Sequence, residues 1–423
     1  MDTMFAELQE TVRETGIWNG DQERTHAFQL SPDVYELGSD QLTQLSQLAP
    51  AIDEVLGGIS RIVAMSEQPD LCGKVLPYGR IGNTLKQGTP YKLPNNRPRN
   101  LPILRKCDLL IDEQGHIWLA EIDATNPRSW GYSIIGRRIC QVLRPEAAQL
   151  PGVAAYIAAE CRRRRIDAVT FLFGDTQRFY EPEFRIIARE LKLLGIEMAV
   201  VNELQVDVRS GVMRHARTGE VLPPTLIDMP PMNYNKPLID WLRAGLKSGT
   251  LQCLISPKHF LASKSLLGVV SNAVGDPAIE ALLRSQISES ALCVVRSHLP
   301  MTHIIGRDWT TPQLANHHGL VLKQSVASGM RGIYFGDEPE FGEALLAASQ
   351  QRGANILQRE VANRRFAWQR FDERGELDPP GEWQLRLTAY FSRTSVEDIA
   401  ITARPDKAVH GAKDAILTGT VLV

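Results

Sequence analysis

The chain has 423 residues, of which 43% are hydrophobic, and this is enough for two or three domains with apolar cores. Its 47 basic and 49 acidic residues give a formal net charge of −2, without the basic surface typical of proteins that bind nucleic acids or anionic membranes. The six cysteines form no CxxC pair, no apolar run approaches the roughly 20 residues that cross a bilayer, and the first residues do not resemble a signal peptide, so we expect a soluble cytoplasmic protein with reduced thiols.

The first 150 residues are expected to contain helices and one β-hairpin. A helical pattern covers residues 40–63, and a loop rich in proline, asparagine and glycine follows at 73–102. Residues 107–111 and 116–123 then predict two short strands joined by a turn. A further helix is expected at 133–143.

The middle of the chain repeats a strand–helix–strand rhythm. Residues 167–174 predict a strand, residues 181–195 an amphipathic helix that ends at a glycine, and residues 196–203 a second strand. Such alternation is typical of a small parallel α/β domain. We therefore divide the chain into regions 1–150, 151–260 and 261–423.

The last region again alternates between strands and one helix. The predicted strands cover residues 319–324, 331–336, 355–361, 382–391 and 414–423, and the predicted helix covers residues 340–351.

Three carboxylates meet at the predicted hairpin. Glu121 and Asp123 lie two positions apart on one strand, so their side chains share a face, and Asp108 on the preceding strand is expected close to both. Oxygen ligands without histidine or cysteine suit a hard cation, Mg²⁺ or Mn²⁺, and magnesium usually binds substrate phosphates as well. Alternatively, these acids are solvated or pair with Arg128, Arg137 or Arg138.

A lysine and a glycine-rich loop form a second candidate site. Lys323 ends one strand, and Gly329, Arg331 and Gly332 precede the next. Small residues allow backbone N–H groups to approach phosphate oxygens, although the lysine precedes the glycines, unlike in a Walker A loop. An ordinary β-hairpin with a flexible tip is the alternative.

Other basic residues are weaker candidates. Lys264 precedes a short apolar helix, and Arg386 lies in mid-strand between apolar neighbours, where an arginine needs a carboxylate or phosphate partner. Arg404 adds positive charge near the end of the chain. Each could instead pair with a structural acid.

In chain order, these motifs resemble those of the circularly permuted ATP-grasp enzymes, the group that includes glutathionylspermidine synthetase and eukaryotic-type glutathione synthetase. That group places an aspartate and a Glu-x-Asn motif before the phosphate-binding lysine and its glycine-rich loop. Here the order is Asp108, Glu121 to Asp123, Lys264, Lys323 with Gly329 and Gly332, residues 356–361 and Arg386. The resemblance spans roughly residues 100–423.

The resemblance implies an α/β (α+β) protein with a circularly permuted ATP-grasp-like fold and an inserted small parallel α/β domain. It implies an ADP-forming ligase that joins a small carboxylic acid to an amine through an acyl phosphate, with ATP and Mg²⁺ (or Mn²⁺) as cofactors, and a homodimer would fit the group. The implied metal ligands are Asp108, Glu121 and Asp123. The implied phosphate and adenine contacts are Lys264, Lys323, Gly329, Arg331, Gly332, Gln358, Arg359 and Val361. The implied clamp on the substrate carboxylate is Arg386 with Arg128 or Arg404.

Two departures from the group's pattern leave other functions open. The acidic motif reads Glu-x-Asp, and the loop between Gln324 and Gly332 contains no acidic residue to help bind a metal. A phosphotransferase that forms a stable phosphorylated product, and an inactive nucleotide-binding or scaffold protein, are the alternatives.

Overall fold

The computed structural model describes most of the chain and defines its elements. The described residues are 3–16, 28–67, 76–86, 100–125, 128–228, 235–271, 275–306, 309, 316–327, 332–351, 355–410 and 414–423. The helices in them are α1 (Thr3–Arg13), α2 (Ser39–Ser66), α3 (Leu76–Lys86), α4 (Trp130–Leu143), α5 (Val153–Arg163), α6 (Glu181–Leu193), α7 (Lys236–Ser248), α8 (Ser265–Val270), α9 (Pro277–Gln286), α10 (Glu289–Ser297) and α11 (Phe341–Gln350). Within these residues no helix is long and apolar enough to cross a membrane.

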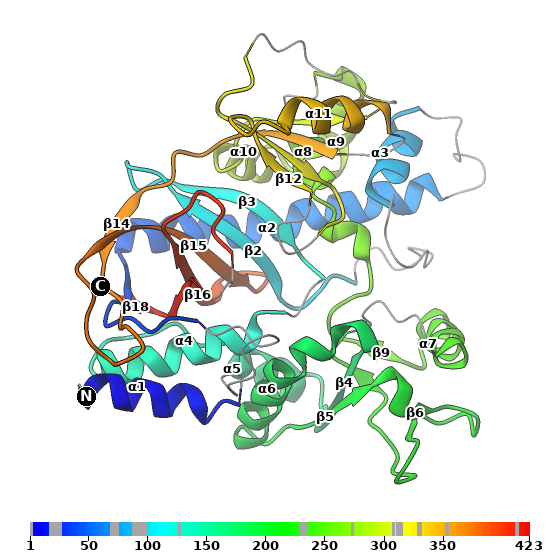
Figure 1. Cartoon of the computed structure of the whole chain (residues 1–423). Helices are drawn as coiled ribbons and strands as arrows, with labels where there is room; N and C mark the ends of the chain where they lie inside the picture. The colour runs from blue at the N-terminus through cyan, green and yellow to red at the C-terminus, as the bar shows by residue number, and fades with distance from the viewer. Residues whose placement is uncertain are drawn as a thin grey trace.

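The largest sheet is antiparallel and lies at the centre of the molecule (Figure 1). Its strands are β2 (Arg105–Ile111), β3 (Ile117–Asp123), β14 (Arg365–Trp368), β15 (Gly381–Phe391), β16 (Val396–Arg404) and β17 (Ile416–Thr418). The order is β17-β16-β15-β2-β3, and β14 also pairs with β15. The predicted hairpin is confirmed, because β2 and β3 pair in antiparallel register. Its turn is closed by the carboxylate of Asp112, which accepts the N–H groups of Gln114 and His116 at 3.0 and 2.9 Å.

The two faces of this sheet differ because side chains alternate along each strand. Cys107, Leu109 and Leu387 point to one side, where they share an apolar core with Ile52 and Val55 of α2. The opposite face of the same strands carries polar side chains, beginning with Lys106, Asp108 and Glu121. One face of the central sheet is therefore committed to packing and the other is available for chemistry.

A second antiparallel sheet lies beside the first (Figure 1). Its strands are β10 (Thr302–Ile305), β11 (Leu320–Gln324), β12 (Ile333–Phe335) and β13 (Asn355–Arg359), in the order β10-β13-β11-β12. Leu322 and Leu357 pack against Phe341 of α11 on one face. Lys323 belongs to the other face, which α8 approaches so closely that a Cβ on Gly268 would lie 3.3 Å from Cδ1 of Ile304.

A parallel sheet forms the third layer, as predicted for the middle of the chain. Its strands are β4 (Ala168–Phe173), β5 (Glu197–Asn202), β8 (Thr225–Leu226) and β9 (Gln252–Cys253), in the order β5-β4-β8-β9. The predicted strand–helix–strand unit is β4-α6-β5. Small pairs complete the sheets: β1 (Tyr35–Leu37) pairs with β18 (Thr420–Leu422), and β6 (Val206–Asp207) with β7 (Arg214–His215). The division of the chain at residues 150 and 260 stays a prediction.

Two glycines allow α4 to cross the end of the central sheet at close range. A Cβ on Gly136 of α4 would lie 2.6 Å from the carbonyl oxygen of Thr418, and one on Gly419 would lie 2.7 Å from Sγ of Cys140. Side-chain carbons essentially never approach other heavy atoms this closely, so neither position accepts a larger residue without movement of the backbone.

We expect the substitution Gly419→Ala to lower the free energy of unfolding by about 1–3 kcal/mol, because the new methyl group overpacks the contact with α4. The matched substitution Gly342→Ala, at the start of α11, meets no atom within 4 Å and should cost nothing. Urea unfolding of both variants measures the difference. Equal stabilities of the two variants would contradict the close contact.

Candidate active site

The polar face of the central sheet gathers side chains from β2, β3 and β15. Asp108 stands directly opposite Glu121 on one neighbouring strand and opposite Thr388 on the other. One oxygen of Asp108 accepts the hydroxyl of Thr388 at 2.9 Å, and the other lies 3.6 Å from Nη1 of Arg386. Burial raises the pKa of Asp108, but the charges of Arg386 and Lys106 outweigh it and bring the net pKa below the usual value. Asp108 is therefore an ionised carboxylate in a buried place.

Glu121 connects this face to α8. Its Oε1 lies 2.9 Å from Nζ of Lys264, the residue at the start of α8. The same ammonium group donates to the carbonyl oxygen of Ala327 at 2.8 Å, and the side chain of Lys264 is only 4% exposed. A buried lysine is thus shared between a strand of the central sheet and the loop that follows β11.

Lys323 spans the two antiparallel sheets. Its Nζ donates to Oε1 of Gln358 on β13 at 2.6 Å and to the carbonyl oxygen of Ala120 on β3 at 3.2 Å. Nε2 of Gln358 in turn donates to the hydroxyl of Thr302 on β10 at 3.1 Å. Burial lowers the pKa of Lys323 to about 8, because the nearby carboxylates compensate only part of the lost hydration. Within the described residues, Lys323 thus bonds to neutral oxygens and forms no ion pair.

Asp123 and Lys106 form the remaining pair on this face. They are opposite each other in the β2–β3 register, with 3.6 Å between Nζ and Oδ2. Burial lowers the pKa of Lys106. The negative charges of Asp108, Asp123 and Glu121 raise this pKa by a larger amount, so its net value lies above that of an ordinary lysine. Four cationic side chains (Lys106, Lys264, Lys323 and Arg386) thus accompany three carboxylates (Asp108, Glu121 and Asp123), and four minus three leaves one positive charge for an anionic ligand.

The three predicted metal ligands are brought to one face but do not form a joint cluster. Among the residues described, no three side chains of Asp, Glu, His or Cys come together as a metal site. The reason is that Asp108, Glu121 and Asp123 each turn to a different cation. Two opposed carboxylates still suit Mg²⁺, which commonly takes one or two carboxylates and completes its shell with phosphates and water. Asp108 and Glu121 fit that donor set better than Asp123.

Other predicted residues lie at varying distances from this centre. Arg404 is engaged by residues of its own segment, with Nη2 2.6 Å from Oδ2 of Asp414. Arg128 lies over the ring of Tyr180, with 5.2 Å from its guanidinium carbon to the ring centroid, and so faces α6. Arg359 ends β13 with an exposed side chain, and Val361 follows that strand. Arg128 is nevertheless linked to the polar face, because burial lowers its pKa but the charges of Asp123 and Tyr180 raise it further, so the net pKa lies above the usual value.

The glycine-rich loop is described in part. Gly332 has φ +67, and a Cβ there would lie 2.6 Å from Cδ of Gln324, so both conformation and space favour glycine at this end of the loop. Its carbonyl oxygen accepts the N–H of Gln324 at 2.8 Å. Gly329 and Arg331 lie outside the described residues.

Several polar partners at this site were missed from the sequence. Lys106 and Thr388 stand two positions from Asp108 and Arg386, so the alternation of strand side chains could have found them. Thr302 and the carbonyl oxygen of Ala120 had no such signal, because their roles depend on how the two sheets meet.

Comparisons with known proteins bear on the fold. No protein-family model matches the chain, and no curated protein matches it by sequence. The structure resembles that of a glutathione synthetase-like effector from Globodera pallida in its apo form, with a TM-score of 0.59 and 11% identity, over 99% of this chain and 96% of that chain. This likeness establishes the fold alone. A protein assigned as a gamma-glutamylcysteine synthetase from Methylobacillus flagellatus KT gives a TM-score of 0.36 and 9% identity over 86% of this chain and 88% of that chain, which is too low to support a conclusion.

The low pKa of Lys323 should appear in the stability of the protein. Because the pKa is about 8 in the folded chain and about 10.5 in the unfolded chain, the unfolded chain binds more protons between these values, and stability rises with pH there. Relative to Lys323→Met, the wild type should gain up to about 3 kcal/mol between pH 8 and 10.5. Unfolding free energies across this range test it, with Lys247→Met on α7 as a control that should follow the wild type. Parallel curves for Lys323→Met and wild type would contradict the assignment.

Proposed function

We propose that this protein is an ADP-forming carboxylate–amine ligase with a circularly permuted ATP-grasp arrangement. The observation that carries the proposal is the meeting of Lys264 and Lys323 with the Asp108–Glu121 face of the central sheet. The shared fold with a glutathione synthetase-like protein agrees with it. A nucleoside triphosphate requires cations for its phosphates, and its metal requires carboxylates. Here two lysines and two carboxylates from separate elements meet between the two antiparallel sheets.

The two lysines are suited to bind the phosphates of ATP. Lys323 is held by neutral oxygens of Gln358 and Ala120, and Lys264 by Glu121 and the carbonyl of Ala327. Phosphoryl transfer spreads negative charge over several oxygens, and fixed cations in a site with little water stabilise that charge strongly. A triphosphate would replace the neutral partners of Lys323 at small cost, since none of them is an anion.

The carboxylates fit the metal that such a nucleotide brings. Asp108 and Glu121 would hold Mg²⁺ or Mn²⁺, with Asp123 as the third predicted ligand, and the ion would neutralise charge on the β- and γ-phosphates. Binding requires Lys264 and Arg386 to release these oxygens, and the phosphates would take over both cations. Gln358, Arg359 and Val361 are proposed to line the adenine site at the end of β13.

The chemical step consists of two displacements. A carboxylate oxygen of the acid attacks the γ-phosphorus while the bond to the β–γ bridging oxygen breaks, which gives an acyl phosphate and ADP. The amine then attacks the acyl carbon, loses a proton and expels phosphate. Arg386, with Arg128 or Arg404, would hold the carboxylate, and the loop from Lys323 to Gly332 would exclude water from the acyl phosphate.

We expect the substitution Glu121→Gln to reduce the rate of ADP formation by about a hundredfold or more, because it removes a proposed metal ligand and the partner of Lys264 while preserving shape. Glu113→Gln, in the exposed turn of the same hairpin, should leave the rate unchanged. The assay is ADP release that depends on both an acid and an amine, in a screen of amino acids and amines. Full turnover by Glu121→Gln would remove this residue from the site.

The binding of Mg-ATP itself separates the alternatives. We expect Mg-ATP to raise the melting temperature of the wild type, since a ligand that binds only the folded chain stabilises it, and the rise should be lost in Lys323→Met but kept in Lys247→Met. ³¹P NMR of the products distinguishes the reactions, because a ligase releases free phosphate whereas a phosphotransferase retains it on the substrate. Stabilisation without any turnover would favour an inactive nucleotide-binding protein, and no stabilisation would argue against nucleotide binding.

A further inference from the structure

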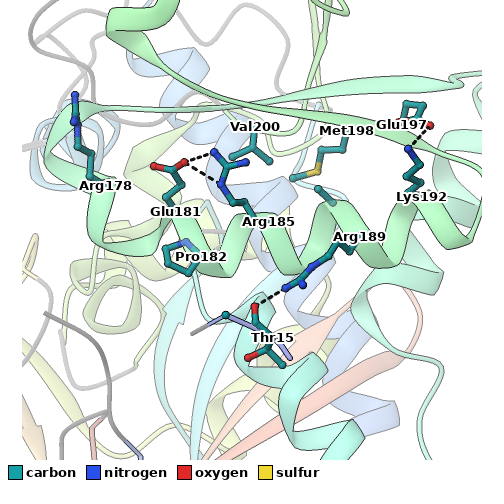
Figure 2. A pocket seen from close by; sticks show the side chains of 12 residues that line it. Thr15, Arg178, Glu181, Pro182, Arg185, Arg189, Lys192, Glu197, Met198 and Val200 are labelled. Carbon is teal, nitrogen blue, oxygen red and sulfur yellow. Dashed lines mark hydrogen bonds and ion pairs between the residues drawn. The ribbon is translucent and has the colours of Figure 1, made fainter. Parts of the chain in front are cut away.

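A groove of about 780 Å³ lies away from the candidate active site, between α6 and β5 (Figure 2). Glu181, Arg185, Arg189 and Lys192 follow one side of α6, as Figure 2 shows, and Met198 and Val200 of β5 lie opposite. The end of α1 closes the groove, because Nη1 of Arg189 donates to the carbonyl oxygen of Glu14 at 2.9 Å and Nη2 donates to that of Thr15. Neither the sequence motifs nor the proposed ligase reaction uses this feature.

One wall of the groove is the edge of the parallel sheet. In the part of the chain that the structure describes, β5 pairs only with β4. The N–H of Glu197 donates to the carbonyl oxygen of Asp167 at 3.0 Å, so it points to the sheet. Because backbone groups of successive strand residues alternate in direction, those of Met198 and Val200 point away from β4. An extended chain laid there would find donors and acceptors in register.

The apolar side chains of this edge are only partly covered. Met198, Ala199 and Val200 are half-buried, whereas Val169 to Phe173 of the neighbouring β4 are all buried. An exposed apolar edge strand is a template for pairing with another chain, and proteins usually shield it. Among the described residues, long charged side chains of α6 lie over this part of β5, and such side chains can move aside.

The charge of the groove is positive. Its lining holds Arg178, Arg185, Arg189 and Lys192 against Glu181 and Glu197, and four minus two gives +2, in a chain whose net charge is −2. Three of these cations form ion pairs with exposed basic side chains in the described part of the chain: Arg178 with Asp175, Arg185 with Glu181, and Lys192 with Glu197, with the basic side chains 62%, 60% and 71% exposed. Exposed ion pairs of this kind contribute little to the stability of the fold, so the carboxylates of a partner could replace these acids readily.

We propose that this groove binds an extended acidic segment of a partner protein, which adds a strand to the edge of β5. Backbone hydrogen bonds to Met198 and Val200 would give affinity, and the basic side chains of α6 would select acidic residues along the added strand. A second copy of this chain is a poorer occupant, because a symmetric contact would bring two grooves of charge +2 together.

The test uses the full chain and a labelled peptide that alternates glutamate and valine over seven residues, with binding followed by fluorescence anisotropy. Binding of this peptide to the wild type is compared with three cases. Two use altered peptides: one has lysine in place of glutamate, and one is N-methylated at three consecutive central residues. The third uses the double variant Arg185→Glu/Lys192→Glu of the protein, with Lys247→Glu as its control. We expect binding to weaken at least tenfold in each comparison, to persist in the control, and to weaken with salt.

Four results would overturn the proposal. The first is that the acidic peptide does not bind, and the second and third are that the lysine peptide or the N-methylated peptide binds equally well. The peptide comparisons need no altered protein, so a variant that fails to fold cannot hide the answer. The fourth is a dimer in sedimentation velocity that the double variant separates, since it would assign the groove to a second copy. None of these results affects the ligase assay, because that site uses other residues.

Discussion

The arrangement of this protein depends on the contacts that Lys264 and Lys323 make with the end of β3. Lys264 bonds to the carboxylate of Glu121, and Lys323 to the carbonyl oxygen of the preceding residue, Ala120. These two ammonium groups come from α8 and β11, which belong to the layer of the second antiparallel sheet, so they tie the two sheets together at one point. This point therefore matters both for the stability of the fold and for the proposed function. The oxygens that hold the lysines are the ones a nucleotide and its metal would compete for.

The same contacts explain how a strand that is otherwise apolar can end in two carboxylates. Adjacent like charges are costly when buried, unless each has a cation and hydrogen bonds of its own. Here Glu121 has Lys264, Asp123 has Lys106, and Asp108 has Arg386 together with the hydroxyl of Thr388. Such a network holds its groups in fixed places before any ligand binds, and a site that fixes charges in advance needs less rearrangement during the reaction.

Local patterns in the sequence predicted several strands, among them β2, β3, β4, β5 and β15, and the faces on which the charged residues lie. They did not predict β10, β14 or β16, or the partners of the charged residues. The β2–β3 hairpin and the β4-α6-β5 unit follow from alternation and turn residues, which act over a few positions. The pairing of Lys264 with Glu121 joins residues 143 positions apart, and nothing local encodes it. For the same reason the sequence suggested one cluster of three acids, whereas the folded chain distributes them among three cations. Arg404, which the resemblance offers for the substrate clamp, has an ion-pair partner that the local pattern did not indicate, Asp414, ten residues later.

The parallel sheet is linked to the candidate site through the start of α4. Oε2 of Glu183 on α6 accepts the N–H of Gly131 at 3.0 Å, and a Cβ on Gly131 would lie 3.0 Å from Cα of Glu183, so only glycine permits this approach. Burial raises the pKa of Glu183 to about 8, although the Gly131 N–H and the charges of Lys106 and Arg128 oppose the rise. A carboxyl group that is easily neutralised therefore holds α6 beside Arg128, whose guanidinium already lies over the ring of Tyr180. The ion pair between Arg138 of α4 and Glu190 of α6, at 2.6 Å, fixes the same two helices at a second place, so the position of Arg128 depends on how α4 and α6 pack.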